Sequence, residues 1–85
     1  MERYELKVTK CFEKDFRKLD PQVKRRVDSA IRRLGDDPRQ GKPLRGELSG
    51  KWSLRVGDYR VIYVVNEAEK AVILYTVKHR KVAYR

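Results

Sequence analysis

The sequence predicts one α+β domain, in which a two-helix hairpin packs on one face of a twisted, mainly antiparallel, four-stranded sheet. Three observations support this. A chain of 85 residues has room for one small domain only, so residues 1–85 form a single unit. Apolar residues recur at helical spacing in the first half of the chain. In the second half they alternate with charged residues, as in strands, which gives the order β-α-α-β-β-β.

The first half contains a strand and two helices. Residues 4–8 alternate apolar and charged side chains, so a short strand is expected there. Residues 10–35 carry two apolar stripes of helical spacing, divided by Asp20 and Pro21, which suit an N-cap and the first helical position. Gly35 is expected to end the second helix in a left-handed conformation. The inward-facing residues of the strand are expected to be Tyr4, Leu6 and Val8.

The second half contains three strands. Residues 36–50 are rich in glycine and proline and are expected to form a loop. Residues 51–56 and 59–65 read as a hairpin, because both are rich in strand-forming residues and Gly57-Asp58 is a two-residue turn signal. Residues 71–77 are almost all apolar, which predicts a central strand buried on both faces.

Composition excludes several classes of protein. Cys11 and His79 are the single cysteine and histidine, so neither a disulfide framework nor a zinc site is expected. No apolar run is long enough for a membrane span, and the start has no signal-peptide pattern, which favours a cytoplasmic protein without a membrane partner. No glycine-rich phosphate loop is present, and no cofactor is expected. The 22 Lys and Arg against 12 Asp and Glu give a net charge of +10, which favours nucleic acid or an acidic protein as partner.

The hairpin register separates apolar from basic side chains. A turn at Gly57-Asp58 places Val56 opposite Tyr59, and Arg55 opposite Arg60. One face then carries apolar side chains for the helices, and the other is basic. Two arginines opposite each other repel, and an anion between them would relieve the repulsion; a solvated charged face is the alternative. The basic face is expected to contain Lys51, Ser53, Arg55 and Arg60.

A second basic cluster follows the last strand. Arg80 ends this strand and can approach Arg60 if the strand lies beside the hairpin. Tyr84 can stack on a base or orient a hydroxyl, or simply pack the tail. His79 ordinarily titrates near neutrality, but as the sequence neighbour of Arg80 on a strand it faces the opposite way. The other basic members of the cluster are Lys78 and Lys81.

Other conspicuous residues have ordinary structural interpretations. The tryptophan and several tyrosines fall where packing is the expected role, and Cys11 is expected to be a small buried or half-buried residue. The arginines and lysines of the second helix cover its polar face and are expected to be solvated, with phosphate contact as the alternative. The aromatic residues expected to pack are Trp52, Tyr59, Tyr63 and Tyr75.

Together these segments resemble a known family. The runs Pro43-Leu44-Arg45-Gly46 and Trp52 to Tyr63 (WSLRVGDYRVIY), followed by His79-Arg80 and Tyr84, are similar to the RelE/ParE superfamily of toxin–antitoxin toxins. The first half agrees, with the turn Lys18-Leu19-Asp20-Pro21 between the two helices. The resemblance covers essentially the whole chain and implies the RelE-like fold.

The resemblance to the RelE branch implies a ribosome-dependent endoribonuclease that cuts mRNA through attack of the 2′-OH on the adjacent phosphate, without a metal. The implied partners are the ribosome, mRNA and an acidic, RelB-like antitoxin. Where the family's pattern has a lysine as the usual candidate base, this chain has Ser53. The implied catalytic residues are Arg60, Arg80 and Tyr84. The implied substrate-binding residues are Lys51, Ser53, Arg55, Lys78, His79 and Lys81.

Two other functions remain open at this point. ParE-like toxins share the fold and are described as inhibitors of DNA gyrase, and the serine at position 53 favours this branch slightly. A non-catalytic basic domain that only binds an antitoxin is the third reading. The damaged macromolecule distinguishes them: cut mRNA, stalled gyrase or neither.

Overall fold

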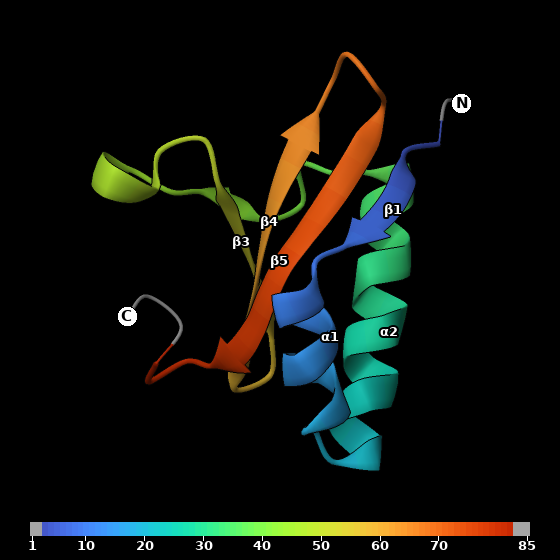
Figure 1. The fold of residues 1–85 in the computed structure, drawn as a ribbon, viewed down its shortest axis with the longest axis vertical. Helices are drawn as coiled ribbons and strands as arrows, with labels where there is room; N and C mark the ends of the chain where they lie inside the picture. The colour runs from blue at the N-terminus through green and yellow to red at the C-terminus, as the bar shows by residue number, and fades with distance from the viewer. Residues whose placement is uncertain (1–2, 83–85) are drawn as a thin grey trace.

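The computed structural model describes residues 3–82 and shows two helices packed on one face of a five-stranded sheet (Figure 1). The strand order is β1-β5-β4-β3-β2; β1 pairs with β5 in parallel, and the other pairs are antiparallel. The predicted fold class is therefore confirmed, with one strand more than expected. The elements in chain order are β1 (Glu5–Val8), α1 (Lys10–Arg17), α2 (Pro21–Asp36), β2 (Lys42–Pro43), the 3-10 helix η1 (Gly46–Leu48), β3 (Trp52–Val56), β4 (Tyr59–Asn66) and β5 (Ala71–His79).

Local sequence signals explain both helix starts. The Thr9 hydroxyl accepts a hydrogen bond from the Phe12 N–H at 3.1 Å, which caps α1. α2 begins at Pro21, as expected. The expectation for Gly35 was wrong, because α2 continues to Asp36. A Cβ at position 35 would lie 3.3 Å from the Tyr4 carbonyl oxygen, so glycine serves close approach of β1 here rather than a left-handed turn.

The sheet is organised around β5. This strand lies between β1 and β4, and its near-continuous apolar sequence fits a central position. Val8 does not face inward as expected: 46% of it is exposed, because it ends the edge strand β1 just before the chain turns into α1. Cys11, expected to be at least half-buried, is also exposed. The segment expected to be only a loop contains β2 and η1.

The hydrophobic core lies between the helices and the sheet. Leu34 and Val27 of α2 pack there together with Val61 of β4, and all three are fully buried. Trp52 packs against this cluster, as expected. No described helix has the length and apolar character that crossing a membrane requires.

A buried tyrosine hydroxyl attaches β2 to the rest of the sheet. Tyr63 of β4 is fully buried, and its hydroxyl donates to the Pro38 carbonyl at 2.8 Å. The same oxygen accepts a hydrogen bond from the Gly41 N–H at 3.1 Å. A Cβ on Gly41 would lie 2.5 Å from the Ser53 carbonyl oxygen, so only glycine allows β2 to pass this close to β3. Burial raises the pKa of Tyr63, so its hydroxyl stays protonated and able to donate.

Replacing Tyr63→Phe is expected to destabilise the protein by about 1–3 kcal/mol, because the N–H of Gly41 and the carbonyl of Pro38 would lose their buried partner. Urea denaturation at neutral pH measures this change. Tyr59→Phe is the matched control, since the Tyr59 hydroxyl makes no hydrogen bond within residues 3–82. Equal stability of the two variants would contradict the structural role of the Tyr63 hydroxyl.

A second, exposed network joins β1 to the β4–β5 turn. The Glu67 carboxylate accepts a hydrogen bond from the Tyr4 hydroxyl and another from the Arg39 guanidinium, each at 2.7 Å. The Lys70 ammonium lies 3.4 Å from the same carboxylate. The Tyr4 hydrogen bond, helped by Lys70 and Arg39, lowers the pKa of Glu67 below its ordinary value of 4.5. Ionised Glu67 is therefore favoured in the folded state.

Glu67→Gln is expected to lower the free energy of unfolding at pH 7, and the difference from the parent chain is expected to disappear in acid. The sign follows from linkage. A lowered pKa in the folded state gives stability that is present above pH 4.5 and lost as the pH falls through the folded-state value. Urea denaturation between pH 7 and pH 3 tests this, with Glu47→Gln as the control, because Glu47 forms no ion pair in the described part of the chain. A difference that does not change with pH would contradict the assignment.

Candidate functional site

The β3–β4 hairpin has the register that the sequence predicts. Gly57, with φ of 58°, forms the turn, and Val56 pairs with Tyr59, Leu54 with Val61 and Trp52 with Tyr63. These six residues belong to the core or pack against it, on the helix side of the sheet. The side chains between them therefore lie on the opposite face, which we call the cationic face; its hairpin residues are Ser53, Arg55, Arg60 and Ile62.

Two arginines lie side by side on the cationic face. Arg55 and Arg60 are direct cross-strand partners, and within residues 3–82 neither forms an ion pair with a carboxylate. Arg55 is exposed, and its Nε donates only a long hydrogen bond of 3.4 Å to the Gly57 carbonyl. Arg60 is half-buried; its Nη1 atom is fully buried and has no hydrogen-bond partner among the described residues. A buried cationic donor without a partner is costly, and two neighbouring guanidinium groups without a carboxylate favour an anion beside them.

Arg55 and Arg60 line a pocket at the β2 edge of the sheet. The pocket has a volume of about 530 Å³ and extends from Arg60 across Ser53 to β2. Ser53 is the buried polar residue of the described chain, with 7% of its surface exposed. We call this hollow the β2 pocket. Its lining residues are Gln40, Gly41, Lys42, Pro43, Leu44, Ser53, Leu54, Arg55 and Arg60.

Lys42 is a cation of this pocket that the sequence did not indicate. Lys42 of β2 pairs directly with Ser53 of β3, so the two side chains lie on the same face of the sheet. Lys42 therefore places a positive charge beside position 53. A two-residue strand has no alternation to detect, so the sequence carried no signal for this pairing.

Lys51 and Tyr75 interact across the sheet. The Lys51 ammonium lies 5.3 Å from the centre of the Tyr75 ring, a cation–π contact. Tyr75 is half-buried and lies at a β-bulge, where the β4–β5 register shifts. It was expected to pack like the other tyrosines, but it does not belong to the core cluster on the helix side.

Two further candidates have partners that turn them away from the arginines. Lys78 pairs with Arg60 in the strand register, but its ammonium lies 3.1 Å from the carboxylate of Asp15, on α1. His79 is the cross-strand partner of Tyr59, and their rings meet edge to face with centroids 5.5 Å apart. Since Tyr59 packs against the helix-side core, His79 lies on the face opposite Arg60.

The C-terminal candidates lie near the hairpin turn. The Arg80 N–H donates to the Asp58 carbonyl at 2.7 Å, which brings the backbone of Arg80 to the same end of the sheet as Arg55 and Arg60. Arg80 and Lys81 are both exposed. Tyr84 lies outside the described residues, so the structure does not show its position.

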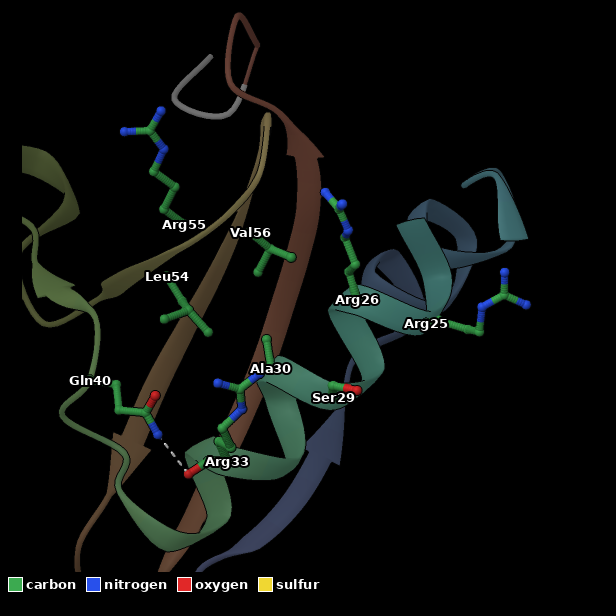
Figure 2. Close-up of a pocket in the computed structure, with 9 residues that line it drawn as sticks. All are labelled: Arg25, Arg26, Ser29, Ala30, Arg33, Gln40, Leu54, Arg55 and Val56. Atoms are coloured by element: carbon green, nitrogen blue, oxygen red, sulfur yellow. Dashed lines mark hydrogen bonds between the residues drawn. The ribbon is translucent and has the colours of Figure 1, made fainter. Parts of the chain in front are cut away.

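A second groove lies between α2 and β3 (Figure 2). It has a volume of about 540 Å³. Ala30, Leu54 and Val56 form an apolar floor, and Arg26 and Arg33 extend beside it, whereas Arg25 and Arg55 extend away. We call it the α2–β3 groove. Its cationic lining residues are Arg25, Arg26, Arg33 and Arg55.

The side chains described in residues 3–82 include no group of three or more His, Cys, Asp or Glu residues that could hold a metal ion. The arginines and lysines of the cationic face can bind anions.

Comparisons with known proteins identify the family of this chain. Residues 6–84 match the family described as the ParE toxin of the type II toxin–antitoxin system parDE. The chain is 37% identical to the toxin RelG of Mycobacterium tuberculosis over 84 residues, covering 96% of this chain and 97% of RelG. It is 32% identical to the toxin RelE of the same organism, over 96% of this chain and 87% of that protein.

Solved structures give the same result. A RelBE toxin–antitoxin complex from M. tuberculosis contains a chain that superposes with a TM-score of 0.88 at 35% identity, with 94% of each chain covered. The archaeal RelE–RelB complex from Pyrococcus horikoshii gives a TM-score of 0.79 at 30% identity, covering 98% of this chain and 100% of the other. By sequence and by fold, the chain belongs to the RelE/ParE superfamily, as a RelE-family toxin of a type II toxin–antitoxin system.

Proposed function

We propose that this toxin is a ribosome-dependent endoribonuclease that cuts mRNA at the cationic face. The observation that carries the proposal is the Arg55–Arg60 pair, in which a buried guanidinium nitrogen of Arg60 has no partner among the described residues. Such a pair suits a phosphodiester group, because a guanidinium offers planar, paired donors to phosphate oxygens and stays charged at all relevant pH values.

The reaction proposed is attack of an RNA 2′-OH on the adjacent phosphate, with departure of the 5′-oxygen. Negative charge accumulates on the phosphoryl oxygens as the transition state forms. Arg60 stabilises that charge from its fixed position on β4, and Arg55 contributes from β3. Arg80, whose backbone is held beside the hairpin turn, acts as a second phosphate clamp.

Other residues bind the substrate. Lys51, whose ammonium lies over the Tyr75 ring, supplies positive charge that attracts the RNA. Tyr84 orients a base or the attacking hydroxyl. Because the face is open, much of the rate must come from positioning of the mRNA, which the ribosome supplies by fixing its conformation. The net charge of +10 favours binding to the ribosomal RNA surface around the mRNA.

The inhibitor proposed is an acidic, RelB-type antitoxin that occupies the α2–β3 groove. Chains similar to this one are found in complexes with RelB antitoxins. The groove has an apolar floor and a rim of arginines, which suits an amphipathic segment with acidic residues along its edges. Since Arg55 lines both this groove and the β2 pocket, an antitoxin bound here would lie next to the proposed RNA site.

Arg60→Ala is expected to reduce mRNA cleavage on the order of 10²–10³-fold, as removal of one donor from a preorganised oxyanion-binding site does. The measurement is primer extension on mRNA after expression of the toxin from a tightly repressed promoter. New 5′ ends within translated codons are expected for the parent chain, and their loss for Arg60→Ala. Arg17→Ala, which removes one exposed arginine of α1, is the matched control and is expected to cleave normally.

Other outcomes would contradict the proposal in different ways. Growth arrest with intact mRNA would exclude the nuclease and direct the test to gyrase supercoiling, the activity that the ParE name of the matched family suggests. No arrest, combined with tight antitoxin binding, would show that the chain is a non-catalytic binder. Cleavage unchanged in Arg60→Ala would place the active site elsewhere.

Arg33→Glu is expected to weaken binding of the cognate antitoxin by roughly tenfold or more, because a like charge would face the acidic segment in the groove. Isothermal titration calorimetry with the purified antitoxin measures the change. The control is Arg32→Glu, since Arg32 pairs with Asp28 and does not line the groove. Equal affinity of both variants would exclude the groove as the antitoxin site.

A further inference from the structure

We propose that Lys42 is a catalytic residue that protonates the departing 5′-oxygen. The inference rests on the proposed nuclease function and adds to it a residue from outside the β3–β4 hairpin. It is carried by the pairing of β2 with β3, which places Lys42 beside Ser53 and in one pocket with Arg55 and Arg60.

The position of Lys42 is fixed by its backbone. The preceding Gly41 is bound through its N–H to the buried Tyr63 hydroxyl, and the Tyr63 hydroxyl is bound in turn to the Pro38 carbonyl. The contact of Gly41 with the Ser53 backbone is too close for any side chain at position 41. These contacts hold the start of β2 in place, so the exposed Lys42 side chain extends from a rigid point at the edge of the cationic face.

The β2 pocket contains no other group suited to proton transfer. Of its nine lining residues, only Lys42, Arg55 and Arg60 carry charge. Arginine does not give up a proton in proteins, whereas a lysine ammonium can donate one to an oxygen that gains negative charge.

The nearby lysines and the histidine have other partners. The ammonium of Lys78 is held by Asp15, and that of Lys51 lies over the Tyr75 ring. His79 packs against Tyr59 on the opposite face. Among the residues that line the β2 pocket, Lys42 is therefore the one suited to donate a proton beside the arginine pair.

In the proposed step, a bond forms at phosphorus while the bond to the 5′-oxygen breaks. The 2′-oxygen forms a bond to phosphorus and loses its proton to water. The bond between phosphorus and the 5′-oxygen breaks, and the electron pair stays on that oxygen. The oxygen takes a proton from the Lys42 ammonium, and the resulting amine recovers a proton from solvent. The products are a cyclic 2′,3′-phosphate and a 5′-hydroxyl end.

The first experiment compares single-turnover cleavage of mRNA on programmed ribosomes by Lys42→Met, Lys42→Arg and the parent chain. Both variants are expected to be slower by about 10²-fold or more, the usual contribution of a general acid. The loss in Lys42→Arg separates proton donation from charge alone, because arginine keeps the charge but does not release a proton. Lys10→Met, at the exposed start of α1, is the matched control and is expected to cleave like the parent chain.

The second experiment uses an mRNA in which sulfur replaces the 5′-oxygen at the mapped cleavage site. A thiolate leaves without protonation, so Lys42→Met is expected to cleave this substrate within about threefold of the parent chain. Arg60→Ala is expected to remain slow on both substrates, because phosphate clamping is still required. Urea denaturation of each variant shows whether it is folded.

The outcomes separate this inference from the function on which it rests. A parent chain that cleaves no mRNA overturns the proposed function. A parent chain that cleaves, with folded Lys42→Met or Lys42→Arg within about twofold of it, overturns the role of Lys42 alone. A defect in Lys42→Met that is equally large on the sulfur substrate also overturns proton donation and leaves Lys42 as a binding residue.

Discussion

The register of the β3–β4 hairpin is the constraint on which the remaining structure depends. Side chains on a strand alternate between faces, so a shift of one residue would direct Arg55 into the core and Leu54 into solvent. The glycine at position 57, with positive φ, makes the two-residue turn that prevents this shift. Once the register is set, the apolar face receives α1 and α2, and the opposite face brings two arginines together with no carboxylate of residues 3–82 paired to either.

Much of this arrangement could be predicted because it is local. The hairpin pairs, the helix start at Pro21 and the buried central strand all follow from patterns within a few residues, and the structure confirms them. The path of the second helix through Gly35 could not be foreseen. Its glycine is required by the nearby backbone of Tyr4, a contact between segments far apart in sequence.

The candidate site also contains residues that a local pattern identifies and residues whose positions depend on distant contacts. Arg55 and Arg60 were found because they lie on one hairpin, whereas Lys42 belongs to a two-residue strand whose pairing depends on the buried Tyr63 hydroxyl. Lys78 and His79 were expected to bind substrate with the arginines, although strand alternation already turned His79 away from Arg80. Their actual directions are set by Asp15 and Tyr59, partners that no sequence pattern links to them. Arg80 was expected at the end of the last strand, and its backbone lies there beside Asp58.

The parallel pairing of β1 with β5 also governs when the fold can form during synthesis. β1 is the first strand of the described sheet in chain order, and its strand partner there, β5, is the last. Until β5 leaves the ribosomal exit tunnel, β1 has no strand beside it, and the hairpin lacks the central strand against which β4 pairs. Joining segments so far apart also makes folding slow. The sheet that carries the cationic face is therefore complete only after the two ends of the described chain have met.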